Sequence, residues 1–360
     1  MESRPKNYLR DFFQNQNVLV TGHTGFKGSW LALWLHQLGA KVTGFSLSPE
    51  SDPCHFNLLN LKNVINHIEG DLRVPAAIEK CIQETKPSCV FHLAAQALVR
   101  RSYQDPKSTF STNIMGGINL LEALRKSDTI KSLVYITSDK AYYNQEWTWG
   151  YRENDRLGGH DPYSASKAAS ELVFSSYASS FFGDMQDFGA ATARAGNVIG
   201  GGDWSPDRII PDCIRALEKK THIPVRNPGA TRPWQHVLDP LFGYLKLAKA
   251  LTVEPQKFQG AWNFGPETGD ALSVSEVTKR VIKYWGSGKF KMVKKPGPFE
   301  HQLLQLSIEK AKLNLSWKPR WNSERAIKET VHWYRSIANE KKAMDVSCSQ
   351  ICAFEETGCD

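Results

Sequence analysis

The chain has 360 residues, enough for one large hydrophobic core or two moderate ones, and its 41% hydrophobic and 23% charged residues are ordinary for a globular protein. The formal net charge is +8, but the 45 lysines and arginines are interleaved with 37 acidic residues along the chain, so we expect no nucleic-acid partner. Apolar runs such as residues 29–35 fall short of the roughly 20 residues of a membrane-spanning helix, and the N-terminus lacks the apolar segment of a secretion signal, so we expect no membrane partner and a cytoplasmic location.

Short apolar strands alternate with helical stretches over the first half of the chain. A strand, a glycine-rich turn, a helix and a second strand form a βαβ unit over residues 18–21, 22–28, 29–38 and 41–45. The alternation continues with strands over 64–69, 89–92, 132–137 and 189–194 and helices over 75–85, 106–126 and 164–178. This alternation predicts an α/β fold with a parallel, doubly wound sheet and right-handed crossovers.

After Arg194, glycines and prolines interrupt the periodicity, which is typical of loops that build a site. The seven cysteines are irregularly spaced and no histidine follows Cys348, so we expect reduced thiols and no metal site. A last helix is expected over residues 323–337. The expected organisation is a nucleotide-binding domain over 1–195 with a returning segment near 231–262, a smaller α/β substrate-binding domain over 196–230 and 263–337, and a flexible tail over 338–360.

Three glycines, Gly22, Gly25 and Gly28, separate the first strand from the first helix. A dinucleotide-binding turn needs glycine for positive φ, for close approach of the backbone to phosphate and for close packing of helix on sheet. An ordinary turn is the alternative, but the strand before it and the helix after it favour a dinucleotide site. No acidic residue ends the second strand, so NADP stays open as the cofactor. No arginine replaces the acid either, and Asp71 could receive an adenine amino group, so NAD is the favoured cofactor.

Tyr163 and Lys167 lie four residues apart and therefore share one face of a predicted helix. We expect the lysine ammonium to lower the pKa of the phenol, so that the tyrosine can take a hydroxyl proton. A pair on the surface is the alternative, but its position within the continuing βα pattern favours a catalytic role.

Ser138, Asp139 and Lys140 follow the strand at 132–137, at the carboxyl edge of the sheet, where doubly wound folds carry out their chemistry. A capping or turn role for Ser138 and Asp139 is the alternative.

The sequence resembles the extended short-chain dehydrogenase/reductase family and, within it, the nucleotide-sugar 4,6-dehydratases, most closely those that act on CDP-glucose. The resemblance covers residues 17–333 and is carried by the glycine turn, the Tyr163/Lys167 pair and several further segments. These segments are His92-Leu-Ala-Ala-Gln96, Thr137-Ser-Asp-Lys140, Trp149-Gly-Tyr-Arg-Glu153, Arg194-Ala-Gly-Asn-Val-Ile-Gly-Gly-Gly-Asp-Trp204, Arg232-Pro-Trp-Gln-His-Val237 and Trp262-Asn-Phe-Gly-Pro266.

The resemblance implies a Rossmann-type domain with bound NAD, a CDP-glucose substrate and a homodimer that pairs the helix after His92 and the Tyr163 helix with their copies. The implied catalytic residues are Ser138, Asp139, Lys140, Tyr163 and Lys167. The implied cofactor-binding residues are Gly22, Thr24, Gly25, Phe26, Lys27, Gly28, Asp71, Leu72, Ala94 and Ala95, together with Tyr163 and Lys167. The candidate substrate-binding residues are Gln96, Asn197, Arg208, Arg232 and His236.

The implied reaction is redox-neutral: Tyr163 deprotonates the sugar 4-hydroxyl as C4 is oxidised, water leaves across C5 and C6 with Asp139 as general acid, and the hydride returns to C6. Many relatives carry a glutamate as C5 base where this chain has Lys140. A neutral Lys140 acting as base and a charged Lys140 stabilising the enolate both remain open. Three alternatives to this function are considered. A 4-epimerase needs no acid at C6, so Asp139 and Lys140 speak against it, whereas a dehydratase for another nucleotide sugar would use the same machinery. A non-enzymatic dinucleotide sensor would be expected to lack the Tyr/Lys pair, which this chain retains.

Overall fold

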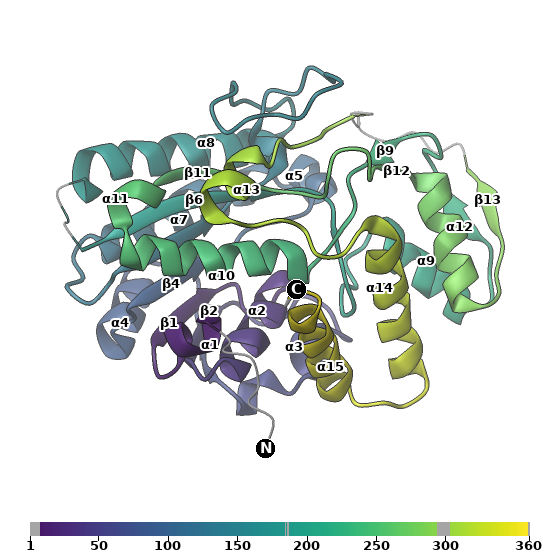
Figure 1. Cartoon of the computed structure of the whole chain (residues 1–360), viewed down its shortest axis with the longest axis horizontal. Coiled ribbons are helices and arrows are strands. Elements are labelled where there is room, and N and C mark those ends of the chain that lie inside the picture. The colour runs from purple at the N-terminus through teal and green to yellow at the C-terminus, as the bar shows by residue number, and fades with distance from the viewer. Residues whose placement is uncertain (1–7, 184, 186, 294–302, 359–360) are drawn as a thin grey trace.

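The computed structural model describes residues 8–183, 185, 187–293 and 303–358. Its centre is a seven-stranded parallel sheet, which confirms the doubly wound α/β fold (Figure 1). In spatial order the strands are β3 (Asn66–Glu69), β2 (Lys41–Ser46), β1 (Asn17–Thr21), β4 (Cys89–His92), β5 (Ser132–Ile136), β6 (Gly189–Ala195) and β11 (Gly260–Phe264). The chain order reverses between β1 and β4, and the crevice at this switch point is where such sheets bind ligands.

Helices cover both faces of the sheet, which is why its central strands read as continuous apolar runs. Val18 and Val20 of β1 point into one core cluster, whereas Leu19 points into the other. One face is covered by α1 (Tyr8–Phe13), α2 (Phe26–Gln37), α10 (Leu238–Val253) and α11 (Pro255–Phe258), and the other by α4 (Pro75–Thr85), α7 (Gly116–Leu124) and α8 (Pro162–Tyr177). Between β2 and β3 lie α3 (His55–Leu58) and the 3-10 turn η1 (Leu61–Asn63).

The segment between β4 and β5 contains the helix expected over 106–126, which runs from Pro106 to Leu124 with a π-helical turn inside it, and a further short helix before it. It comprises α5 (Val99–Gln104), α6 (Pro106–Phe110), the π-helical turn η2 (Ser111–Met115) and α7. Asp105 separates α5 from α6 because its carboxylate accepts a hydrogen bond from the Ser108 nitrogen at 3.0 Å, and Pro106 then starts the new helix without needing a donor.

A second group of elements lies to one side of the sheet, on the right of Figure 1. It contains the small pairs β7 (Val198–Ile199) with β10 (Gln235–His236), β9 (Thr231–Arg232) with β12 (Leu272–Ser273), and β8 (Ile223–Val225) with β13 (Phe290–Met292). Its helices include α9 (Ile209–Glu218), α12 (Val274–Trp285) and α14 (Ser323–Ala338), while α13 (Glu309–Leu315) lies against β11. We expected loops in the segment that forms α9. Pro211 lies in the first turn of this helix, where it is tolerated because the first four backbone nitrogens of a helix have no intrahelical partner.

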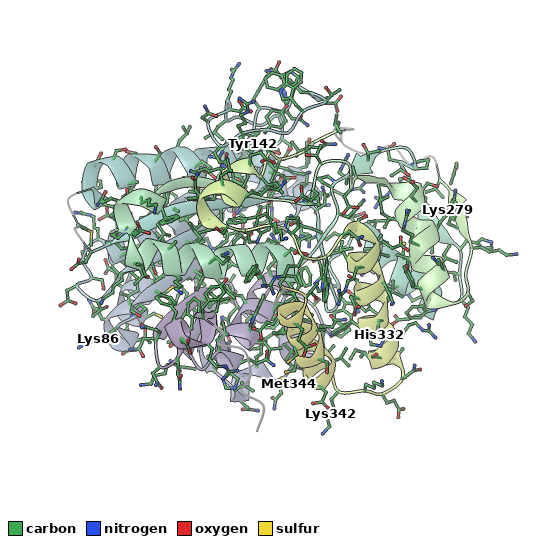
Figure 2. The ribbon with its side chains drawn as sticks, viewed as in Figure 1. Lys86, Tyr142, Lys279, His332, Lys342 and Met344 are labelled. Carbon is green, nitrogen blue, oxygen red and sulfur yellow. The ribbon has the colours of Figure 1, made fainter. Side chains whose placement is uncertain are left out.

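The C-terminal segment differs from the flexible tail that we expected over 338–360. Residues Ala343–Glu356 form α15, which packs on α14, α2 and α3. Phe354 is fully buried against Trp34 and Trp321, and the Trp34 indole donates to Glu355 Oε1 at 2.8 Å. Figure 2 shows Lys342 and Met344 at the start of this helix. Cys348 and Cys352 lie on α15, whereas Cys359 lies outside the described residues.

None of the helices in the described ranges is both long and apolar enough to cross a bilayer.

Candidate active site

The glycine-rich turn lies at the switch point between β1 and β4. Gly22 has a φ of +75°, and a Cβ atom there would meet the backbone nitrogen of Ala94 at 2.6 Å. A Cβ on Gly28 would meet the Gly22 carbonyl oxygen at 2.1 Å, whereas a Cβ on Gly25 would approach that oxygen only to 3.3 Å. The protein's own backbone therefore requires the first and third glycines, while the exposed second glycine leaves space for a ligand to approach.

The N-terminus of α2 faces this space. Gly25 occupies the N-cap position, no side chain caps the helix, and its first turn has no acidic residue, so its first backbone N–H groups suit an anion. The Thr24 hydroxyl hydrogen-bonds the Ser46 hydroxyl at 2.8 Å and donates to the Leu47 carbonyl at 2.9 Å. Hydroxyl groups therefore stand at the end of β2, where a ribose-binding acid would otherwise lie. Phe26 is half-buried and packs against the core.

The other candidate cofactor residues lie at the ends of β3 and β4. Asp71 forms an ion pair with Arg73 at 2.6 Å, which holds the pKa of its carboxyl below the ordinary value. The Leu72 carbonyl accepts from Asn119 at 2.7 Å. Ala94 and Ala95 are half-buried beyond β4, with Ala94 bordering Gly22. The structure thus gathers Ala94 and Ala95 at the turn, whereas the Asp71 carboxylate is already engaged by its neighbour.

Tyr163 and Lys167 are both buried, one turn apart at the start of α8. Burial lowers the pKa of Lys167 to about 8, and the charge of Glu171 opposes this effect. We expected Lys167 to lower the pKa of the Tyr163 phenol, but burial dominates and raises that pKa to about 12 in the protein alone. A hydrogen bond with Ser138 and the charge of Arg208 work in the opposite direction. The ionisation of Tyr163 therefore depends on further positive charge in the site.

Ser138 and Asp139 lie directly beyond β5, beside Tyr163. Ser138 caps the 3-10 turn η3 (Asp139–Ala141), so the capping role we considered is present, and its hydroxyl also donates to Asp139 Oδ1 at 3.0 Å. A Cβ on Gly196 would lie 2.5 Å from Asp139 Oδ2, so the loop after β6 packs directly on this carboxyl. Burial raises the pKa of Asp139 above its ordinary value, against the opposing charge of Lys140. A raised pKa is the direction of shift that suits a carboxyl to general acid catalysis.

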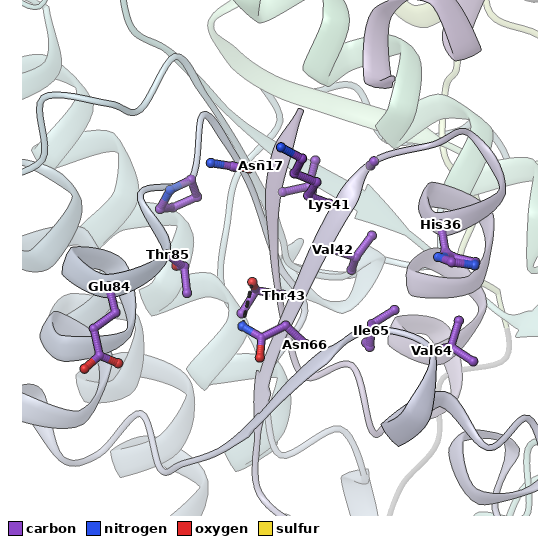
Figure 3. A pocket seen from close by; sticks show the side chains of 13 residues that line it. Asn17, His36, Lys41, Val42, Thr43, Val64, Ile65, Asn66, Glu84 and Thr85 are labelled. Atoms are coloured by element: carbon purple, nitrogen blue, oxygen red, sulfur yellow. Dashed lines mark hydrogen bonds between the residues drawn. The ribbon is translucent and has the colours of Figure 1, made fainter. Parts of the chain in front are cut away.

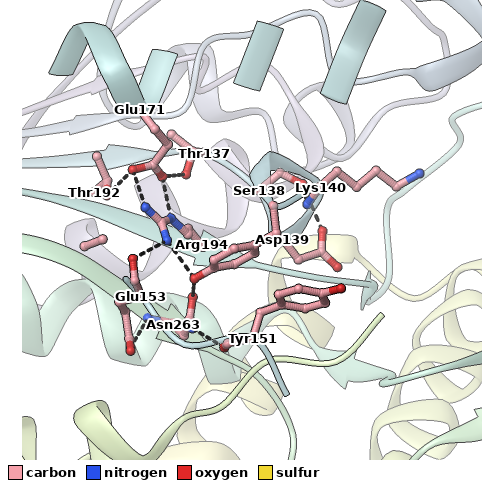
Figure 4. A network of polar contacts seen from close by, with 12 residues as sticks. Thr137, Ser138, Asp139, Lys140, Tyr151, Glu153, Glu171, Thr192, Arg194 and Asn263 are labelled. Atoms are coloured by element: carbon pink, nitrogen blue, oxygen red, sulfur yellow. Dashed lines mark hydrogen bonds and ion pairs between the residues drawn. The ribbon is translucent and has the colours of Figure 1, made fainter. Parts of the chain in front are cut away.

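Lys140 is half-buried, and its backbone nitrogen donates to the Ser138 hydroxyl at 3.2 Å. In Figure 4 its side chain extends away from the Glu171 and Arg194 side chains.

Three cations from different elements, Lys27, Arg208 and Lys167, lie close enough for their charges to interact, and Asp139 lies beside Lys27. Burial lowers the pKa of Lys27, on the first turn of α2, to about 8, and the charges of Arg208 and Lys167 act in the same direction, whereas the charge of Asp139 opposes them. Such mutual effects require proximity, because charges act strongly only over short distances. A crevice that gathers three cationic side chains fits the diphosphate of a dinucleotide or of a nucleotide sugar.

The candidate substrate residues lie on five different segments of the chain. Gln96 is buried, and its side-chain amide contacts Leu98 and Thr109, so it holds the loop after β4. Asn197 is half-buried between β6 and β7, where its carbonyl accepts from the Gln235 nitrogen at 3.2 Å. The charge of Arg208 acts on both Tyr163 and Lys27, which places it near the reacting groups.

Arg208 forms an ion pair with Asp203 at 2.8 Å. Arg232 is half-buried on β9, where it pairs with Leu272 of β12. His236 is fully buried, with its ring against Trp30 and Trp321, and burial lowers its pKa to about 3. His236 therefore packs as a neutral core residue, and its contact with a nucleotide stays a prediction.

The sequence reasoning missed Glu171, which forms a buried ion pair with Arg194 between α8 and β6. Its position four residues after Lys167 was the available signal, because residues at that spacing share a helix face.

A hollow of about 420 Å³ lies at the amino-terminal edge of the sheet, opposite the edge that carries the candidate active site (Figure 3). Its wall combines Asn17, Lys41 and Thr43 with Val42 and Ile65. None of the expected catalytic residues lines it.

Comparisons with known proteins identify relatives along almost the whole chain. A family model described as GDP-mannose 4,6 dehydratase matches residues 19–330. The CDP-glucose 4,6-dehydratase of Salmonella typhimurium is 45% identical over 332 residues, which cover 91% of this chain and 92% of that protein.

Solved structures share the fold. The UDP-glucose 4-epimerase of Thermus thermophilus, in complex with NAD, matches with a TM-score of 0.76 and 25% identity, covering 88% of this chain and 98% of that one. The dTDP-glucose 4,6-dehydratase of Bacillus anthracis, in complex with NAD, matches with a TM-score of 0.74 and 23% identity, covering 91% and 99%. Since the family model spans most of the sequence, the chain belongs to the GDP-mannose 4,6 dehydratase family.

Proposed function

We propose that the protein is an NAD-dependent CDP-glucose 4,6-dehydratase, a hydro-lyase that converts CDP-glucose to CDP-4-dehydro-6-deoxyglucose. The observation that carries this proposal is the buried Asp139 beside Tyr163: an acid next to the Tyr/Lys pair serves elimination of water, which a 4-epimerase does not perform. The choice of CDP-glucose rests on the 45% identity to the Salmonella typhimurium dehydratase.

In the proposed reaction Tyr163 takes the proton of the sugar 4-hydroxyl, and Lys167 and Arg208 supply the positive charge that favours the phenolate. NAD, held at the glycine turn and the N-terminus of α2, would supply the acceptor for the C4 hydride and the donor of that hydride to C6. Between these events the new C4 ketone acidifies the C5 proton, which is removed while Asp139 protonates the departing 6-hydroxyl. A proton returns to C5, so the net change is the loss of one water.

Lys140 is the residue next to Asp139. We propose that it assists removal of the C5 proton, either as the base that takes it or by stabilising the resulting enolate. The Lys140→Met variant addresses this role. We expect it to oxidise C4 and to lose elimination, so that NADH accumulates at 340 nm, whereas full turnover by Lys140→Met would remove Lys140 from the mechanism.

For NAD we propose contacts from the glycine turn, the N-terminus of α2, Lys27 and the ends of β3 and β4 near Asp71, Leu72, Ala94 and Ala95. Support comes from the fit of the positive crevice to a diphosphate and from the two relatives crystallised with NAD. For the sugar nucleotide we propose contacts from Gln96, Asn197, Arg208, Arg232 and His236.

We also propose a homodimer formed by α5 to η2 and α8. Five apolar side chains are exposed on these elements and on the π-helical turn η4 (Ala178–Phe182) that follows α8: Tyr103, Phe110, Met115, Leu172 and Phe181. Because α6 and η2 pack on α8, these residues can form one contact surface for a second copy. Leu172→Glu should yield monomers in light scattering, whereas Leu313→Glu, at an exposed site on α13, should leave the dimer intact.

We place the enzyme in the cytoplasm, where reducing conditions maintain thiols. The buried Cys81, Cys89 and Cys213 fit this location, because burial raises the pKa of each thiol to about 11 or 12 and so limits its reactivity.

The proposal is tested by incubating the protein with catalytic NAD and, separately, CDP-glucose, dTDP-glucose and GDP-mannose, and by following the alkali-induced absorbance of 4-keto-6-deoxy sugars. We expect product from CDP-glucose and none from Tyr163→Phe. Asp139→Asn should oxidise C4 but stall before elimination. Turnover of dTDP-glucose or GDP-mannose in place of CDP-glucose would refute the substrate, and formation of a 4-epimer would refute the reaction.

A further inference from the structure

Glu171 connects α8 to the ends of two strands that carry site residues (Figure 4). Its carboxylate accepts a hydrogen bond from Thr137, which directly precedes Ser138 and Asp139, and one from Thr192 on β6 at 2.8 Å. Arg194 donates to both carboxylate oxygens, at 2.8 Å from Nε and 2.8 Å from Nη2. This two-pronged geometry is that of a guanidinium with an ionised carboxylate.

Arg194 extends the network to a third strand end. Its Nη1 donates to the Tyr142 hydroxyl at 2.6 Å and to the Glu153 carbonyl at 2.9 Å. The Tyr142 hydroxyl in turn donates to Asn263 Oδ1, on β11, at 2.8 Å. Glu171 and Arg194 each have only 3% of the side chain exposed, so water does not compete for these contacts.

Lys167 lies one helical turn before Glu171 on α8, and both are buried. The titratable groups facing Lys167 from other elements are His92 at the end of β4 and Lys27 on α2. Burial lowers the pKa of His92 to about 3, which leaves it neutral, and Lys27 is a cation. Glu171 is therefore the negative group that offsets the burial of the Lys167 ammonium in the described part of the chain.

We propose that Glu171 is a positioning residue, which keeps Lys167 charged and holds the strand ends bearing Asp139 and Gly196 against the catalytic helix. This inference rests on the proposed dehydratase function for its effect on turnover. A buried ion pair is a weak source of stability, because desolvation offsets much of the attraction. The contacts of Glu171 instead reach the strand ends next to the reacting groups. The pair therefore serves the geometry and the charge of the site.

The test compares the full-length protein with Glu171→Gln, which keeps the side-chain shape and removes the charge. The first readout is the pKa of Lys167, followed by NMR of lysines labelled with ¹³C at Cε, with the Lys167 signal assigned by its loss in Lys167→Met. The second readout is the pH dependence of kcat with CDP-glucose. Tyr142→Phe is the control, because it loosens the network and leaves the Glu171 charge in place.

We expect Glu171→Gln to lower the pKa of Lys167 by about one unit or more, as loss of a neighbouring opposite charge does. Because Lys167 acts as an ammonium, the alkaline limb of the kcat profile should move to lower pH by the same amount. Tyr142→Phe should leave both in place. If Glu171→Gln does not fold, the double variant Glu171→Gln with Arg194→Met removes the pair without leaving an unpaired charge and should shift Lys167 in the same direction.

An unchanged pKa of Lys167 in the folded variant would overturn the inference, as would an equal shift in Tyr142→Phe. A wild-type protein that does not turn over CDP-glucose refutes the proposed function alone, because the NMR titration still reports the effect of Glu171 on Lys167.

Discussion

The three glycines of the β1–α2 turn differ in what a methyl group would meet, and this difference can be measured. In Gly28→Ala the new Cβ would lie 2.1 Å from the Gly22 carbonyl oxygen and 2.8 Å from the Cα of His23. Both contacts are with backbone, which cannot rotate away, so we expect a cost of about 3 kcal/mol or more, at the upper end of overpacking. In a chain of this length that cost lowers Tm by roughly 4 °C.

Gly25→Ala should behave in the opposite way. Its Cβ would approach the Gly22 oxygen only to 3.3 Å, so we expect Tm to change little. The methyl group instead projects into the space proposed for the diphosphate, and we expect NAD to bind at least about tenfold more weakly, a loss of about 1.4 kcal/mol. Gly229→Ala is the control, because a Cβ there has no protein atom within 4 Å.

Differential scanning calorimetry and titration calorimetry with NAD measure both quantities on the same preparations. The reasoning fails if Gly25→Ala lowers Tm as much as Gly28→Ala does, or if Gly25→Ala binds NAD as tightly as the Gly229→Ala control.

Two further predictions concern stability. Deleting residues 343–360 removes the buried Ile351 and Phe354 from their contacts, each worth about 1.5–3 kcal/mol, so the urea midpoint should fall, and an unchanged midpoint would show that α15 adds nothing. Burial lowers the pKa of His55, like that of the buried His92, to about 3, well below its ordinary value, so the unfolded chain binds the proton more tightly. The stability that neutral His55 contributes is present above about pH 6.5 and is lost as pH falls toward 3, by about 2 kcal/mol between pH 7.5 and 5.0. Urea unfolding at both pH values should therefore show a smaller loss of stability in His55→Gln than in the wild type. An equal loss in the two proteins would contradict this prediction.

The sheet could be predicted from the sequence because its strands are short, apolar and separated by helices of ordinary length. The helix over Pro75–Thr85 and the strand over Cys89–His92 have the predicted bounds, since a proline and a change of period mark them locally. The helix over 106–126 was predicted as well, except for its π-helical turn η2, which depends on tertiary contacts, among them the Asn113 amide with the Gln96 backbone and the Ser166 hydroxyl.

The candidate site was predictable to a similar extent. The positions of Tyr163, Lys167 and Asp139 follow from helical spacing and from the strand ends. The raised pKa of Tyr163 was not predictable, because it depends on burial by segments far apart in the chain. Glu171 and Arg194 were not paired in advance for the same reason, since β6 meets α8 only in the folded sheet. The helix α15 was missed because the partners of its apolar residues, among them Trp34 and Trp321, lie far away in the sequence.

The measurement that tests the central claim most directly follows deuterium through one turnover. CDP-glucose labelled with deuterium at C4 is converted with substoichiometric NAD, and the product is examined by NMR and mass spectrometry. If one site oxidises C4 and reduces C6, the label will be found at C6 of the 4-keto-6-deoxy product, with one molecule of water lost. Recovery of the label at C4 of an epimer, or its loss to free NADH, would contradict the account.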